Sequence, residues 1–169
     1  MPRLSCFPPV VSEATRTLVL GTMPGQASLL ANEYYAHPRN QFWPIMEALF
    51  SIERGWPYPQ RTAALLKLGV GLWDVLESCV REGSLDSSIQ NKSVVINDFN
   101  GLLRDCPKLN QIVFNGAMAE QLFRRHAMPR FDKGIRPLEM ARLPSTSPAH
   151  ASLNLQSKLL QWRCISSSA

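Results

Sequence analysis

The sequence predicts an α/β fold, a three-layer α/β/α sandwich with a four-stranded, mainly parallel central sheet. Short apolar runs of strand-forming residues alternate with segments of helical pattern along the whole chain. The chain has 169 residues, of which 45% are apolar, so it is long enough to bury the core of one ordinary domain. We therefore expect a single domain over residues 1–169, with residues 166–169 as a frayed, Ser-rich tail.

The expected elements follow one another in a regular order. The strands are apolar runs at residues 17–20, 70–75, 111–114 and 139–143, and the helices cover residues 41–50, 60–67, 98–105, 117–125 and 153–163. Asn40 is expected to cap the first helix, where Pro44 is tolerated in the first turn. Parallel sheets bind ligands beyond the carboxyl ends of their strands, so functional motifs should follow the strands.

The charge of the chain permits a polyanionic partner. It has 18 Lys and Arg against 13 Asp and Glu, which gives a net charge of +5 and a pI near 9.3. Six of the basic residues lie close together: Arg124, Arg125, Arg130, Lys133, Arg136 and Arg142. This segment is interpreted either as a DNA-contacting surface or as a solvated loop, and composition favours neither.

Other function classes are excluded by what the sequence lacks. No apolar run approaches the ~20 residues that span a membrane, and the first residues do not resemble a signal peptide. The four cysteines and three histidines are scattered, which argues against a metal site and favours reduced thiols. We expect a cytoplasmic monomer without a metal or another cofactor.

The first candidate motif covers residues 21–25, directly after the first expected strand, and reads Gly-Thr-Met-Pro-Gly. Two glycines and a proline indicate a fixed turn whose N–H groups can face a ligand oxygen. The motif has neither the Gly-Lys-Ser/Thr ending of a phosphate-binding loop nor the pattern GxGxxG. By itself it is typical of an ordinary turn.

The second motif covers residues 34–43 and reads Tyr-Tyr-Ala-His-Pro-Arg-Asn-Gln-Phe-Trp. An exposed aromatic such as Tyr35 can stack on a nucleobase, and Arg39 can contact a phosphate. Asn40 can position a water or donate to a base carbonyl, although it can equally be a helix cap. Phe42 and Trp43 are expected in the core.

The third motif covers residues 143–150, after the last expected strand, and reads Leu-Pro-Ser-Thr-Ser-Pro-Ala-His. Two prolines around small hydroxyl residues form a stiff loop with hydrogen-bond donors, which suits gripping phosphates and pressing into a duplex. A rigid connector is the alternative. The candidate DNA-contacting residues of this loop are Ser145, Thr146, Ser147, Pro148 and Ala149.

Taken in order, the three motifs resemble the hypoxanthine-DNA glycosylase branch of the uracil-DNA glycosylase superfamily, over residues 5–163. The middle motif carries most of this resemblance, and it is also similar to the mismatch-specific uracil and thymine glycosylases. The resemblance implies the α/β/α fold and hydrolysis of the glycosidic bond of a deaminated base flipped out of DNA. The two alternatives are a uracil or thymine mismatch glycosylase and a DNA- or nucleotide-binding module that has lost catalysis.

The resemblance also implies roles for single residues, with two departures from the superfamily pattern. Met23 stands among the base-binding residues where the superfamily has a water-activating Asp or Asn, and Leu143 stands where the uracil enzymes have His. Neither side chain can replace the missing group. The hypoxanthine branch also lacks both groups and is thought to depend on the Asn of His-Pro-Arg-Asn, which is Asn40 here.

Three further residues complete the expected base-binding site. Tyr35 matches the aromatic that stacks on the flipped base, and Asn115 should reach the site from the end of the third strand. Asp74 stands where the uracil enzymes have a base-reading Asn. An ionised Asp74 only accepts hydrogen bonds and would disfavour adenine, whereas a protonated Asp74 can also donate, and a plain structural role is the alternative. Because no Lys lies in the motifs, we expect neither a Schiff base nor strand cleavage.

Overall fold

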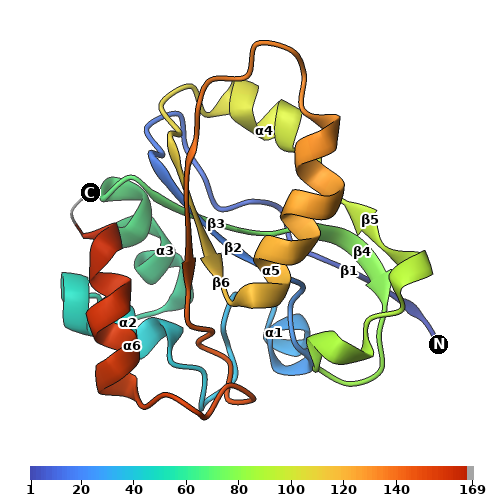
Figure 1. The fold of residues 1–169 in the computed structure, drawn as a ribbon. Coiled ribbons are helices and arrows are strands. Elements are labelled where there is room, and N and C mark those ends of the chain that lie inside the picture. The colour runs from blue at the N-terminus through green and yellow to red at the C-terminus, as the bar shows by residue number, and fades with distance from the viewer. Residues whose placement is uncertain (167–169) are drawn as a thin grey trace.

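The computed structural model describes residues 1–166 and confirms the expected three-layer α/β/α sandwich (Figure 1). The central sheet has the order β3-β2-β6-β7, and all three neighbouring pairs are parallel. Its strands are β2 (Thr17–Gly21), β3 (Val70–Asp74), β6 (Gln111–Asn115) and β7 (Glu139–Leu143). Their carboxyl ends therefore lie at one edge, as the sequence motifs require.

Helices cover both faces of this sheet, whose two inner strands, β2 and β6, are buried on both sides (Figure 1). One face carries α2 (Phe42–Phe50), α3 (Tyr58–Lys67) and α6 (Leu155–Trp162), and the other carries α4 (Phe99–Asp105) and α5 (Ala117–Leu122). Along β2, Leu18 and Leu20 pack in the core of the α4 and α5 face, whereas Val19 packs in the opposite core. This alternation is the period of two expected of a strand.

A second, antiparallel sheet was not expected from the sequence. It has the order β1-β4-β5, built from β1 (Arg3–Ser5), β4 (Leu76–Val80) and β5 (Val95–Ile96). These strands are short, and β4 begins only one residue after β3, so the apolar pattern does not separate the two. The short helix α1 (Gln26–Ala31) was also missed, since its N-cap residue Gly25 makes no side-chain capping bond.

Capping decides the ends of several helices. The Asp98 side chain accepts from the Gly101 N–H at the start of α4, and Asn154 accepts from the Ser157 N–H at the start of α6. Helix α5 was expected to continue to residue 125 but gives way to a π-helical turn. The remaining short turns are η1 (Asp86–Ser88), η2 (Asn91–Ser93), η3 (Phe123–Ala127, the π turn), η4 (Met128–Arg130) and η5 (Arg163–Ile165).

Two expectations for the C-terminal tail and the basic segment are affected by the structure. Ser166 bonds to the Arg163 carbonyl, and residues 167–169 of the expected tail lie outside the described residues. The Arg136 guanidinium donates to the carbonyls of Leu103, Cys106 and Leu109, so it stabilises the end of α4 and is not free for DNA.

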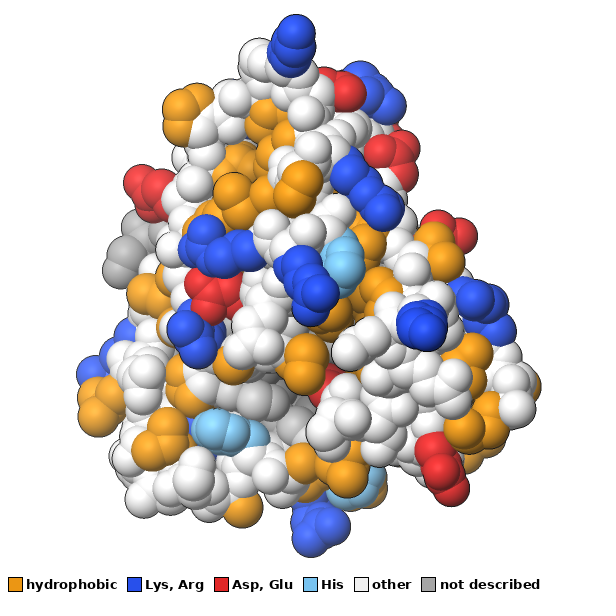
Figure 2. Space-filling view, turned by 45° about the vertical axis from the view of Figure 1, so that its right-hand side comes forward, with side chains coloured by type: hydrophobic (Ala, Val, Ile, Leu, Met, Phe, Trp, Pro, Cys, Tyr) orange, Lys and Arg blue, Asp and Glu red, His pale blue; other side chains and the backbone are white. Residues whose placement is uncertain are grey.

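Two of the other basic side chains are paired with an acidic residue. Arg124 and Arg142 both pair with Glu120, at 2.9 and 2.6 Å. The loop after η4 lies at the end of the sheet opposite the carboxyl ends of the strands (Figure 1). On the face of the molecule that Figure 2 shows, Lys and Arg side chains are spread out, with acidic side chains between them. Within residues 1–166, no helix has the length and apolar character that crossing a bilayer requires.

Candidate active site

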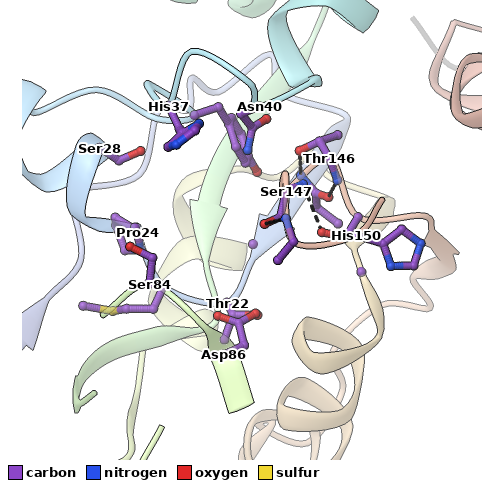
Figure 3. Close-up of a pocket in the computed structure, with 18 of the residues that line it drawn as sticks. Thr22, Pro24, Ser28, His37, Asn40, Ser84, Asp86, Thr146, Ser147 and His150 are labelled. Atoms are coloured by element: carbon purple, nitrogen blue, oxygen red, sulfur yellow. Dashed lines mark hydrogen bonds between the residues drawn. The ribbon is translucent and has the colours of Figure 1, made fainter. Parts of the chain in front are cut away.

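A cavity of about 460 Å³ opens at the carboxyl ends of the central strands (Figure 3). Its size lies in the usual range for small-molecule sites. It brings together most of the residues expected from the three motifs: Met23, Tyr35, Asn40, Asp74, Asn115, Ser145, Thr146, Ser147, Pro148 and Ala149. Arg39 is exposed and does not line the cavity, although it directly precedes Asn40.

The buried end of the cavity is formed by Gly21, Asp74 and Tyr35. Gly21 and Asp74 are register partners at the ends of β2 and β3. A Cβ at Gly21 would lie 2.5 Å from Asp74 Oδ1 and 3.5 Å from the Tyr35 hydroxyl, so only glycine leaves room for both groups. Among the described residues, neither Asp74 Oδ2 nor the Tyr35 hydroxyl has a hydrogen-bond partner, although both atoms are buried. Such atoms are costly unless a ligand satisfies them.

The charge state of Asp74 follows from its surroundings. Burial, and then the nearby Asp86, raise the pKa of Asp74 to about 8, and Arg81 only partly opposes them. Asp74 is therefore protonated at neutral pH, so its carboxyl group can both donate and accept. Exclusion of adenine by an acceptor-only carboxylate does not apply in this state. The structural alternative, an arginine partner for Asp74, is not seen among the described ion pairs.

Tyr35 adopts an unusual backbone conformation at this site. Its φ of 59° lies in the left-handed region, which is unfavourable for a tyrosine and is found mainly where the surrounding structure imposes it. One face of its ring stacks on Phe42, with the centroids 4.1 Å apart. Burial, and then Asp74, raise the pKa of Tyr35 far above its usual range, so the hydroxyl remains a neutral donor.

Asn40 combines the two roles left open by the sequence. Its Oδ1 accepts from the Phe42 N–H at 2.9 Å, so it satisfies the first N–H of α2 although the N-cap residue is Gln41. The carbonyl oxygen was expected to orient a water, but one of its acceptor positions is already used. The amide Nδ2 has no hydrogen-bond partner within residues 1–166, and Asn40 borders the cavity (Figure 3). Asn40 thus offers a donor to the site.

Thr146 holds the third motif in place. Its hydroxyl and N–H make a reciprocal pair of 2.9 Å hydrogen bonds with the Asn115 side chain, and its carbonyl accepts from the Gln41 N–H. Thr146 is fully buried, so the expectation that it contacts DNA is wrong. Asn115 borders the cavity and makes one hydrogen bond from each end of its amide to Thr146, so it also positions the third motif.

Replacement of Asn115 by alanine should lower the free energy of unfolding by about 1–3 kcal/mol, because the buried N–H and hydroxyl of Thr146 would lose their partners. Urea denaturation measures this loss. Thr146→Val is the matched control, since it retains the bond from the Thr146 N–H to Asn115 and should cost less. Equal midpoints for wild type and Asn115→Ala would contradict the assignment.

A family model described as "Uracil DNA glycosylase superfamily" matches residues 8–164, nearly the whole chain. The chain belongs to this superfamily. Two curated relatives are both named "Hypoxanthine DNA glycosylase". The protein of Methanosarcina barkeri is 38% identical over 65% of this chain and 69% of its own length, and that of Methanosarcina acetivorans is 40% identical over 67% and 71%.

A solved structure from the same superfamily has a similar fold. The solution structure of a "putative Uracil DNA glycosylase" from Methanosarcina acetivorans is 33% identical and superposes with a TM-score of 0.74, over 97% of this chain and 99% of that one. The resemblance inferred from the three motifs is therefore confirmed at the level of the superfamily.

The two departures from the superfamily pattern have clear structural consequences. Met23 lines the cavity and is nearly buried, and only its backbone carbonyl makes a hydrogen bond, to Arg81. Leu143 is buried in the core beneath α2 and α6. Neither side chain supplies a polar group, so catalysis requires groups from elsewhere in the cavity.

The sequence motifs missed one wall of the cavity. Ser84 and Asp86 line it from the segment between β4 and β5, together with Ser28 of α1 (Figure 3). The segment reads Arg-Glu-Gly-Ser-Leu-Asp at residues 81–86, which is typical of an exposed turn. Nothing in its local pattern distinguishes it from an ordinary surface loop, because its place beside the cavity depends on the second sheet.

Proposed function

We propose that this protein is a monofunctional DNA glycosylase that hydrolyses the glycosidic bond of hypoxanthine in DNA. The observation that carries the proposal is the pair of buried, unpartnered polar atoms at the end of the cavity, Asp74 Oδ2 and the Tyr35 hydroxyl. A protonated Asp74 offers a donor and an acceptor side by side, which complements the N1–H and C6=O edge of hypoxanthine. The names of the two Methanosarcina relatives support the same substrate.

The proposed mechanism begins with extrusion of the base from the stack, which costs a few kcal/mol. Stacking on Tyr35 returns on the order of 1–3 kcal/mol, and Ser147, Pro148 and Ala149 fill the vacated space. The base leaves as an anion, so donors placed around it lower the barrier. Asn40 Nδ2 and the backbone amides after Gly21 are the proposed donors.

Release of free base from oligonucleotide duplexes tests this function. A panel containing hypoxanthine, uracil, xanthine or ethenoadenine at one position should give fastest release from the deoxyinosine duplex, with strand breaks only after alkali. Release mainly from uracil would support the second candidate, a mismatch glycosylase, because uracil shares the lactam N–H and C=O edge. Tight binding without release from any duplex would instead indicate a binding module.

DNA binding should weaken steeply with salt, because each phosphate contact releases condensed counterions. Arg39 is exposed beside the cavity, so Arg39→Ala should lower the slope of log affinity against log salt by about 0.9. Fluorescence anisotropy of the protein with a labelled duplex measures the slope. Arg130→Ala is the matched control, since it removes the same charge from η4, which leads into the loop at the far end of the sheet. Equal slopes for both variants would contradict the proposed placement of the DNA.

A further inference from the structure

The segment from Arg81 to Gln90, called here the 81–90 loop, is fixed against the cavity. Arg81 and Ile89 form an antiparallel bridge, and the Gln90 N–H donates to the Val80 carbonyl, so the loop is closed at its base. At its tip, the Ser84 hydroxyl accepts from the Gln26 N–H at the start of α1. The loop thus holds Asp86 at a defined place on the cavity wall.

Arg81 anchors this loop to the turn after β2. Its guanidinium is buried and donates to the carbonyls of Met23, Pro24 and Gly83, at 3.4, 2.6 and 3.1 Å. It also lies 3.7 Å from Asp86 Oδ1. A buried cation needs compensating partners, and Asp86 is one of the partners of Arg81. Arg81 therefore holds Asp86 beside the turn of residues 21–25, in which Met23 stands where the superfamily has a water-activating residue.

Only two carboxyl groups of the described residues line the cavity, Asp74 and Asp86. Asp74 lies at the buried end and is protonated at neutral pH. Asp86 keeps 38% of its side chain exposed, so water reaches it. Burial raises the pKa of Asp86, whereas Thr22, which lies beside it in Figure 3, and Arg81 oppose that rise. A carboxylate with a raised pKa is a better proton acceptor than an ordinary one.

We propose that Asp86 is a catalytic residue that supplies, from the 81–90 loop, the carboxylate missing at the position of Met23. The water oxygen forms a bond to C1′ while the bond from C1′ to the base nitrogen breaks, and its electron pair leaves with the base. Asp86 takes one proton from the water, and the released base anion is later protonated by solvent. Asn40 lies on the opposite side of the cavity (Figure 3), so the leaving base and the attacking water are served by different groups.

This inference rests on the proposed glycosylase function, and single-turnover excision from a deoxyinosine duplex tests it. Asp86→Asn should slow excision by about 10²-fold, because a general base typically contributes at least that factor. Affinity for a duplex carrying an uncleavable 2′-fluorinated deoxyinosine should stay within a few-fold of wild type. In Asp86→Ala, added formate should restore part of the rate, since it replaces the missing carboxylate.

Asp132→Asn is the matched control: it removes a carboxylate paired with Arg104 on the exposed surface and should keep the wild-type rate. If Asp86→Asn does not fold, Asp86→Glu retains the charge opposite Arg81, and the displaced carboxylate should still slow excision by about tenfold or more. Wild-type rates in the folded Asp86 variants would overturn the role of Asp86 alone. Failure of the wild type to release any base would overturn the proposed function and this inference with it.

Discussion

Replacement of Asn40 by alanine should slow excision of hypoxanthine by about 10²–10³-fold, the usual loss when one preorganised donor is removed. Met23 and Leu143 supply no polar group, and the Asn115 amide is used on Thr146, so few side chains remain to stabilise the departing base. The Asn40 amide nitrogen is free at the cavity because its oxygen is held by the Phe42 N–H. Single-turnover kinetics on a deoxyinosine duplex measure the effect.

The capping bond of Asn40 requires a control, because loss of a cap costs about 1 kcal/mol of stability. Asn40→Asp keeps the capping oxygen but replaces the donor with an anion beside an anionic leaving group. We expect it to fold and bind DNA like wild type and still excise slowly. If both folded variants excise within a few-fold of wild type, Asn40 is only a cap.

Excision should also fall as the pH rises through about 8, the pKa of Asp74. Below this pH the carboxyl group is protonated and donates to the base. Above it the group is an anion that has lost its donor and repels the departing base, so the rate should fall about tenfold per pH unit. Asp86 and Arg81 are the charged groups that act on Asp74, and the raised pKa shows that burial together with Asp86 outweighs Arg81.

Asp74→Asn separates this titration from other alkaline effects. The amide keeps a donor and an acceptor at every pH, so the variant should excise hypoxanthine without the decline near pH 8. Ionisation of the substrate itself would affect both enzymes equally. The same decline in both enzymes would therefore falsify the assignment to Asp74.

Thermal unfolding provides an independent measurement of the change in the pKa of Asp74 on folding. The pKa of Asp74 is raised on folding from 3.8, so the folded state keeps a proton that the unfolded state releases. The free energy of unfolding of wild type should then fall relative to that of Asp74→Asn as the pH rises from about 4 to 8. Above that range the difference between the two free energies should be constant. A difference that does not change with pH would mean that Asp74 is ionised in the fold.

Much of the fold could be predicted from local patterns. The four central strands were found because each is a short run with apolar residues, bounded by turn residues, and β2, β3 and β6 are buried along their whole length. The antiparallel sheet was missed because β1 and β5 have only three and two residues, and because one residue separates β4 from β3. Strands this short are stabilised by their neighbours, which a local pattern does not reveal.

The residues of the candidate site were likewise predicted only in part. Asn40 was identified from its motif and from the family resemblance, and the roles of Tyr35 and Asp74 were implied by that resemblance. The structure places all three at the cavity, at the edge where the parallel strands end. Thr146 was misassigned as a DNA contact because its burial depends on Asn115 and Gln41, which are distant in sequence.

The sequence by itself determined the superfamily, the order of the central elements and the edge of the sheet at which the site lies. Only the tertiary structure decided the protonation of Asp74, the free end of Asn40 and the presence of Asp86 in the cavity. The physical reason is that strand periodicity and turn chemistry act between near neighbours in the chain. Burial, Coulomb interactions and hydrogen-bond partners depend instead on which distant segments the fold brings together.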